Sequence, residues 1–200
     1  MTKATRESVL TLLYIIFGLG GALLAGYVIL GSKLFQTTNR QLFGFLVIGF
    51  SGSLVYAAIR LKGFGYGLLM IILMFFGQLA LNPPLCGSSA INAAIWALPV
   101  GLAFTASAYL FKSLNRIPFG KFLIMAFFIG LGYSIAVVFF KLRFHSPLEP
   151  HEILSFGLAG LKVGGFIGIG MEIVDLIGTR MHSKGPEFVV NSVAAPWGKG

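Results

Sequence analysis

Charged residues are scarce in this chain, and acidic residues are the scarcest. Of its 200 residues 10% are charged, with 6 Asp and Glu against 15 Lys and Arg, whereas an ordinary soluble domain has about 25% charged residues. Hydrophobic residues make up 56% of the chain, and the mean hydropathy is +0.89. This composition excludes an ordinary soluble domain and predicts a membrane protein. The basic residues stand in ones and twos between apolar runs, which argues against a nucleic-acid partner and is typical of topology signals.

Cysteine and histidine are also rare. Cys86 is the single cysteine, so an internal disulfide is excluded, and the sequence has no Cys–His cluster that would bind zinc or an iron–sulfur centre. His145, His151 and His182 fall outside the apolar runs, so no run supplies an axial haem ligand. We therefore expect no cofactor and no metal. For the loop Pro147–Glu152, weak metal binding or pH sensing is one interpretation, and a solvated helix start with an acidic first turn is the favoured one.

Long apolar runs are the main feature that the chain does have. A helix needs about 20 residues to cross a ~30 Å hydrocarbon core, and the runs of suitable length are Val9–Leu30, Leu42–Ile59, Phe64–Leu81, Ala90–Phe111, Phe119–Phe140 and Ile153–Gly178. The first is too long for a signal peptide and lacks a small-residue cleavage site, so we expect it to be retained. The connections are short, so consecutive spans must be antiparallel.

The sequence therefore predicts an all-α fold, a polytopic helical bundle with about six transmembrane helices in a lipid bilayer. Residues 1–8 are expected to be a short N-terminal segment, 9–178 the transmembrane domain and 179–200 a polar surface tail. Lys and Arg are concentrated before the first span, after the second and fourth, and after the sixth. By the positive-inside rule, both termini are expected in the cytoplasm, with the protein in the plasma or inner membrane.

A short pattern recurs in the two halves of the chain. Asn39-Arg40-x-x-Phe43-Gly44 precedes one apolar run and Asn115-Arg116-x-x-Phe119-Gly120 precedes another. Each run ends in alternating basic residues, Arg60-Leu61-Lys62 and Lys141-Leu142-Arg143. This pattern predicts an inverted repeat of three plus three spans, as in many secondary transporters. The alternative is chance recurrence of residues that are frequent in membrane proteins.

Small residues at four-residue spacing predict close helix packing in the first and sixth spans. The candidate helix-packing residues are Gly18, Ala22 and Gly26 in the first span, and Gly160, Gly164 and Gly168 in the sixth.

The sixth span also carries ionisable residues. At about 100° per residue, Asp175 lies on the face of the sixth-span glycines, Glu172 lies at its edge, and Lys162 lies on the opposite face. A charge at membrane depth costs several kcal/mol unless it faces protein or water. We therefore expect a central sixth helix, wedged between others, with Lys162 facing polar groups such as Gln78.

Lys162, Glu172, Asp175 and Gln78 are thus the candidate substrate- or ion-binding residues. A buried lysine without a carboxylate can switch with proton occupancy or bind an anion, and the simpler alternative is that Lys162 extends toward the outer surface or bonds to a backbone carbonyl. The two acids could take up a cation or relay a proton, and the alternative is that they are solvated and balanced by basic residues of the tail.

Two short motifs resemble motifs of known membrane protein families. Gly49-Phe50-Ser51-Gly52 resembles the GxSG nucleophile motif of rhomboid intramembrane proteases. The resemblance implies Ser51 as nucleophile, but that chemistry needs a histidine on a facing helix, and no span contains one. Asn82-Pro83-Pro84 resembles the Asn-Pro-Ala of aquaporins, yet it has no counterpart in the second half and is more simply a helix stop. We expect no catalytic residues and no enzyme activity.

These features predict a small channel- or transporter-like protein with a site near the middle of the sixth span. The alternative is a non-catalytic subunit of a larger membrane complex, or a homo-oligomer, in which glycine seams serve docking. A membrane enzyme acting on lipid is a third hypothesis. The third span is almost entirely apolar before Gln78, which weakens the transport hypothesis because transport requires a hydrated path.

Overall fold

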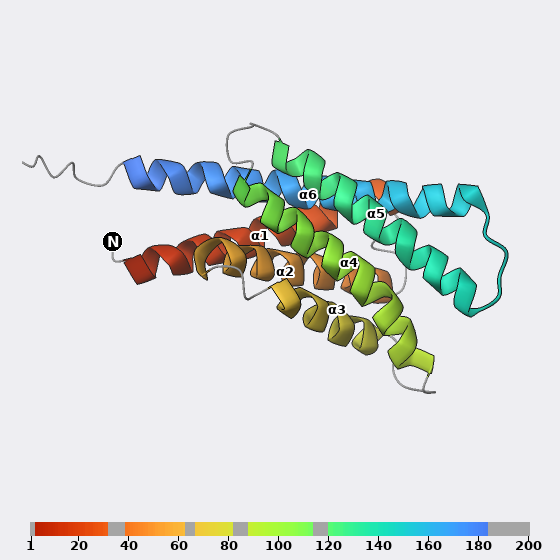
Figure 1. Ribbon diagram of the computed structural model, residues 1–200. Coiled ribbons are helices and arrows are strands. Elements are labelled where there is room, and N and C mark those ends of the chain that lie inside the picture. Colours follow the sequence, from red (N-terminus) through yellow and green to blue (C-terminus); the bar gives the residue numbers. More distant parts are fainter. Residues whose placement is uncertain (1–2, 32–38, 63–66, 82–87, 114–119, 184–200) are drawn as a thin grey trace, which may run out of the picture.

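The computed structural model describes residues 3–31, 39–62, 67–81, 88–113 and 120–183. Runs of Leu, Ile, Ala, Met and Phe interrupted by Gly- and Pro-containing connections favour separate helices, and the described residues form six of them (Figure 1). They are α1 (Lys3–Leu30), α2 (Asn39–Lys62), α3 (Gly67–Leu81), α4 (Ser88–Ser113), α5 (Gly120–Arg143) and α6 (Pro150–Ser183). The predicted all-helical fold is confirmed.

Five of these helices are long and apolar enough to cross a membrane, which confirms the predicted membrane-type helical bundle. The shorter helix is α3, whose 15 residues extend about 22 Å at ~1.5 Å per residue, less than a ~30 Å hydrocarbon core. The predicted third span begins at Phe64, which lies outside the described residues. The count of six spans therefore stays a prediction.

Large apolar side chains cover the outside of the bundle. Leu12, Phe76, Phe127 and Leu154 are each more than half exposed, and they belong to α1, α3, α5 and α6. Apolar exposure on this scale is typical of a surface that lipid chains solvate.

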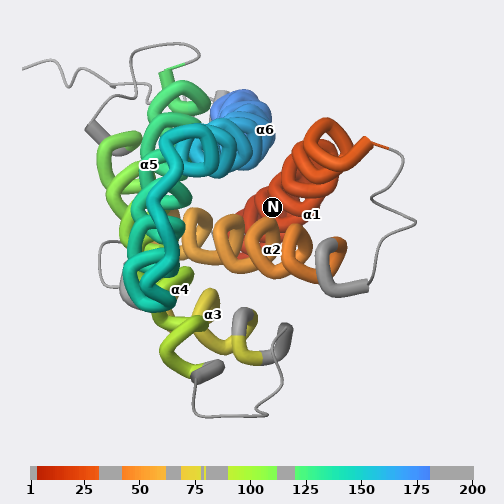
Figure 2. The backbone as a smooth tube through the Cα atoms, turned by 90° about the vertical axis from the view of Figure 1, so that its right-hand side faces the viewer, coloured from red at the N-terminus to blue at the C-terminus, as the bar shows by residue number. Residues whose placement is uncertain are grey.

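Each helix packs against the next one along the chain, and α6 also packs against α1. Figure 2 shows α2 in the middle of the bundle, between α1 and α3, and α2 also contacts α4 and α6. In the most apolar segment of α2, 50% of the residues are buried, whereas in that of α6 33% are buried. The most buried of the five long helices is therefore α2, while α6, which was expected to be central, is wedged between α5 and α1. Helix α6 packs mainly against α5 and α1, so its remaining side faces outward.

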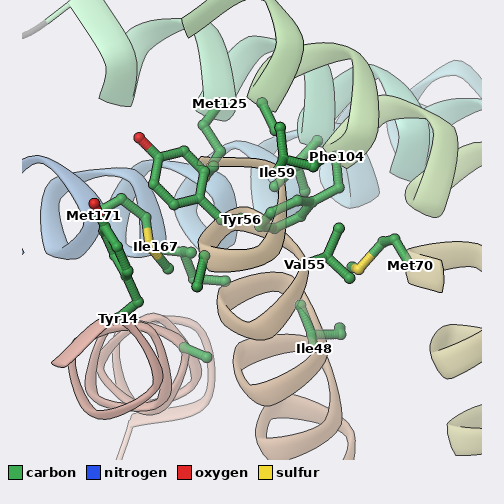
Figure 3. Packing of buried hydrophobic residues seen from close by; sticks show 14 of the residues in the cluster. Tyr14, Ile48, Val55, Tyr56, Ile59, Met70, Phe104, Met125, Ile167 and Met171 are labelled. Carbon is green, nitrogen blue, oxygen red and sulfur yellow. The ribbon is translucent and has the colours of Figure 1, made fainter. Parts of the chain in front are cut away.

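Flexible and aromatic side chains fill the core around α2 (Figure 3). Met70, Met125 and Met171 are fully buried together with Phe104, and methionine adapts well to irregular gaps between helices. A Cβ atom at Gly52 would lie 2.5 Å from the Phe104 ring. The Phe104 ring thus occupies the space that a side chain at residue 52 of α2 would fill.

Glycines set the distance between α5 and α6. A Cβ at Gly164 would lie 2.5 Å from the backbone oxygen of Met125, and one at Gly160 would lie 2.8 Å from the backbone oxygen of Ile129. A Cβ at Gly168 would likewise meet the α5 backbone, at 2.7 Å. The two helices pack backbone to backbone along this seam, which increases their dispersion contacts in lipid.

Helix α1 meets α6 through a reciprocal pair of glycines. A Cβ at Gly21 would lie 2.5 Å from the backbone oxygen of Phe166 on α6, and a Cβ at Gly170 would lie 2.7 Å from the backbone oxygen of Phe17 on α1. Helix α6 therefore has glycine-lined contacts on two sides.

The predicted packing glycines of α1 face α2. A Cβ at Gly18 would overlap the hydroxyl of Ser53, and a Cβ at Gly26 would lie 2.9 Å from the Phe45 ring. Both positions thus make room for a side chain of α2.

The connection from α5 to α6 is a tight turn built around His145. The backbone N–H of Ser146 donates to the carbonyl of Lys141 at 3.0 Å, and that of His145 donates to Leu142 at 3.2 Å. These two bonds are the Schellman pattern of a helix end. Its left-handed residue is His145, with φ of 49°, and a side chain is unfavourable in that conformation. Pro150 then begins α6, at a position where a missing N–H costs nothing.

We expect His145→Gly to raise the free energy of unfolding by about 0.5–1 kcal/mol, because glycine adopts positive φ without strain. Thermal unfolding in detergent would measure the change. Ser146→Gly is the control, and it should have no stabilising effect, since residue 146 is not in the left-handed region. Equal or lower stability of His145→Gly would contradict this prediction.

Candidate functional site

A single carboxylate on α6 joins polar groups from three other helices. Asp175 has 8% of its surface exposed. It accepts hydrogen bonds from the hydroxyls of Tyr14 on α1 and Tyr56 on α2, the latter at 2.9 Å. Lys121 Nζ on α5 lies 2.5 Å from it, and Arg60 Nε on α2 lies 3.5 Å away. These five residues are called the Asp175 cluster below.

Helical spacing explains why these side chains meet. Tyr56 and Arg60 are four residues apart, on one face of α2, as neighbours on a helix surface must be. Tyr14 lies one turn after Leu10. A Cβ at Gly178 would lie 3.3 Å from the Leu10 side chain, so this side of α1 faces α6. Lys121 stands in the first turn of α5 and reaches α6 beyond the end of the glycine seam.

The four partners are divided evenly between the two carboxylate oxygens. Oδ1 is contacted by the Tyr14 hydroxyl and by Arg60, and Oδ2 by the Tyr56 hydroxyl and by Lys121. An ionised carboxylate accepts about four hydrogen bonds, so the described partners occupy its full capacity. A protonated carboxyl group would have to donate instead, and neither Lys nor Arg can accept. The arrangement therefore suits an ionised Asp175.

Aromatic rings surround this charged centre on its apolar side. Tyr14 and Tyr56 pack edge to face with ring centroids 5.2 Å apart, and Tyr56 packs against Phe111 of α4 at 5.8 Å. Figure 3 shows the two tyrosines among the buried side chains of the core. Because low polarity strengthens charge interactions and also the penalty for an unpaired charge, every member of the cluster depends on the others.

A small cavity adjoins the cluster between α2 and α4. It has a volume of about 30 Å³ and is lined by Tyr56, Ile59, Arg60, Ala108 and Phe111. That is enough for a water-sized molecule. The Arg60 side chain, 34% exposed, forms its polar wall.

Of the predicted site residues, the structure describes the side chains of Lys162, Glu172 and Asp175, and Lys162 lies apart from the two acids. Lys162 is exposed on the outer face of α6, because α6 has neighbours on two sides and not on the third. Glu172 is half-buried, one turn before Asp175. The side chain of Gln78 lies outside the described residues. The Asp175 cluster thus includes one of the four candidates.

The other four members of the cluster escaped sequence reasoning. Arg60 and Lys121 were interpreted as topology signals at helix ends, and the tyrosines carry no charge pattern. One signal was present, since Asp175 lies near the end of its span, and basic residues at the ends of neighbouring spans were its nearest available partners. Ser51 of the rhomboid-like motif is buried, and its hydroxyl bonds to the carbonyl of Val47 in its own helix.

A second ion pair lies at the other end of the same helices. Lys141 Nζ on α5 is 2.5 Å from Glu152 Oε2 on α6, and both side chains are partly exposed. Among the described residues no group of three or more metal-ligating side chains is found.

The chain matches no known protein family, curated protein or solved structure. The geometry of the Asp175 cluster is therefore the basis on which function is proposed.

Proposed function

We propose that this protein is a small channel- or transporter-like membrane protein, and that the Asp175 cluster is its ion-responsive site. The observation that supports this is a buried carboxylate held by donors from α1, α2 and α5. Ionisable groups are costly in a membrane and are typical of ion and proton pathways when they face the bundle interior. The location shifts the proposed site from mid-membrane to the end of the bundle that holds the start of α1 and the end of α6 (Figure 1).

The cluster connects α1 and α2 with α5 and α6. Tyr14, Tyr56 and Arg60 belong to the α1–α2 pair, and Lys121 and Asp175 belong to the α5–α6 pair. Neutralising Asp175 would leave two cations facing each other across this boundary. Uptake of a proton by Asp175 would therefore favour separation of α2 and α5 at this end. The loops and termini at this end carry most of the Lys and Arg residues, so the positive-inside rule assigns it to the cytoplasmic side.

The repeated sequence pattern supports the same proposal. The basic ends of α2 and α5 each supply an ion-pair partner to α6, Arg60 to Asp175 and Lys141 to Glu152. The two pairs lie near opposite ends of α6. Gates at both ends are what alternating access requires.

Flux measurements in reconstituted vesicles test this function. Vesicles containing the wild-type chain should conduct at least one of protons, sodium, potassium, chloride or phosphate faster than empty vesicles, and Asp175→Asn should lose at least about tenfold of that flux. Glu152→Gln removes the carboxylate of the ion pair at the other end, and we expect it to reduce the flux as well. Wild-type vesicles as impermeable as empty ones, or full flux in Asp175→Asn, would refute the proposal.

The small volume of the interior cavity favours the alternative, a non-catalytic subunit of a larger membrane complex. The cavity beside Arg60 holds about 30 Å³, and the larger hollows given for the described residues, of about 330–450 Å³, lie on the outer surface. Two of these are apolar grooves, and the third is lined in part by Glu7, Ser8 and Thr11. A subunit does not need a hydrated path. Purification in mild detergent discriminates, since a monodisperse particle containing this chain alone would count against the subunit function.

A further inference from the structure

Lys162 lies at membrane depth on the outer surface of the bundle. The exposed large apolar residues of α6 run from Leu154 to Leu176, about 33 Å at ~1.5 Å per residue, which matches a ~30 Å hydrocarbon core. Lys162 is exposed within this stretch. It lies about 12 Å from the Leu154 end and about 21 Å from the Leu176 end.

The side chain is too short to bring its charge out of this layer. A lysine stem of four methylenes extends on the order of 6 Å, and it points toward the N-terminal end of its helix. The ammonium therefore stops about 6 Å inside the apolar stretch of α6. A cation at such depth is costly unless another group pairs with it.

The described part of the chain provides no such partner. On α6, Glu152 pairs with Lys141 and Asp175 with Lys121, while Glu172 is about 15 Å away along the axis. None of the described ion pairs or side-chain hydrogen bonds involves Lys162. Its counter-charge must then come from outside the described chain.

An apolar groove lies between α1 and α6, and its α6 lining begins one turn after Lys162, at Phe166. It has a volume of about 340 Å³, and glycines form its floor, among them Gly20, Gly21 and Gly170. A Cβ at Gly20 would meet no atom within 4 Å. Ile169 and Ile173 form the α6 wall, and at ~100° per residue both lie within about 20° of Lys162 around the helix. Lys162 therefore stands on the same side of α6 as the groove, about 10 Å before Ile169 along the axis at ~1.5 Å per residue.

We propose that this groove binds one transmembrane helix of a partner membrane protein, which carries an Asp or Glu opposite Lys162. A glycine floor allows the close approach on which helix association in lipid depends, and a carboxylate supplies the missing charge. A second copy of this chain is a poor occupant, because the groove lining is apolar or glycine and would add no acid. The inference does not depend on the transport proposal.

A synthetic helix can test the pairing directly. The full chain, labelled with a donor dye, is reconstituted in phosphatidylcholine vesicles with a dye-labelled polyleucine transmembrane peptide that has one Glu about four residues inside one end of its apolar stretch, the depth of the Lys162 ammonium at ~1.5 Å per residue. Energy transfer should show at least about tenfold tighter association than with Gln or Leu at the same position, equivalent to ~1.4 kcal/mol. Lys162→Leu should abolish this preference, and Lys162→Arg should retain it.

Two further variants separate the groove from the charge. Gly20→Leu fills the open floor and should weaken association without unfolding the protein, whereas Leu131→Ala, in the groove between α4 and α5, should have no effect. Association that does not depend on Glu, or that survives in Lys162→Leu, would overturn the proposal. So would loss of the Glu preference on adding phosphatidylglycerol, because lipid phosphate would then be the partner of Lys162.

Discussion

Asp175→Ala is expected to lower the free energy of unfolding by about 3–5 kcal/mol, the range observed when one partner of a buried ion pair is removed. Asp175 is the common acceptor for Tyr14, Tyr56, Lys121 and Arg60. Without it, Lys121, whose side chain is 10% exposed, becomes a cation without its described partner. Titration with SDS in detergent micelles would measure the loss.

Glu152→Ala is the matched control for this experiment. It removes the other Lys–carboxylate pair between α5 and α6, also 2.5 Å long but with both side chains 24–33% exposed, and such pairs contribute about 0–1 kcal/mol. The double variant Asp175→Ala/Lys121→Met should recover part of the stability, because it removes the unpaired cation as well. If Asp175→Ala costs no more than Glu152→Ala, the cluster is not the structural centre proposed here.

Gly164→Ala is expected to destabilise the α5–α6 pair by about 2–3 kcal/mol, at the upper part of the range for overpacking. The new methyl group would lie 2.5 Å from the backbone oxygen of Met125. Backbone cannot rotate away as a side chain can, so the two helices must separate along their seam. The thermal midpoint in detergent, and the rate of proteolysis in the α5–α6 turn, would both report the change.

Gly165, the next residue, is the matched control, because a side chain there would point in a different direction from the same turn of α6. A Cβ at Gly165 would lie 3.7 Å from the Cβ of Ala126, which is an ordinary contact distance. Gly165→Ala should therefore be neutral or slightly stabilising, since alanine favours helix over glycine. Equal losses in the two variants would mean that helix propensity, and not interhelical spacing, decides the outcome.

The helices were predictable because their signal is local. Long apolar runs bounded by Gly, Pro and basic residues predicted six membrane-crossing helices, and five of the runs lie within a few residues of helices long and apolar enough to cross a membrane. The third run is ambiguous for the same reason, because its described helix is only 15 residues long. Four-residue glycine spacing on the sixth span similarly marked one face of one helix.

The neighbours of each face were not predictable, because they depend on which helices meet. Periodicity placed Asp175 on the glycine face of α6, but it could not indicate that Tyr14, 161 positions earlier in the chain, would donate to it. The same reasoning placed Lys162 opposite the glycines and assumed that another span would cover it. In the structure that side of α6 is open.

Membrane character and the helical elements thus follow from the chain itself, since burying apolar side chains and satisfying backbone hydrogen bonds within one segment need no distant residue. The central place of α2, the outward position of Lys162 and the assembly of the Asp175 cluster required the tertiary structure. Each depends on the order in which glycine-lined faces pair, and several pairings bury similar apolar area in lipid. Close backbone contact and charge pairing between particular helices select one of them.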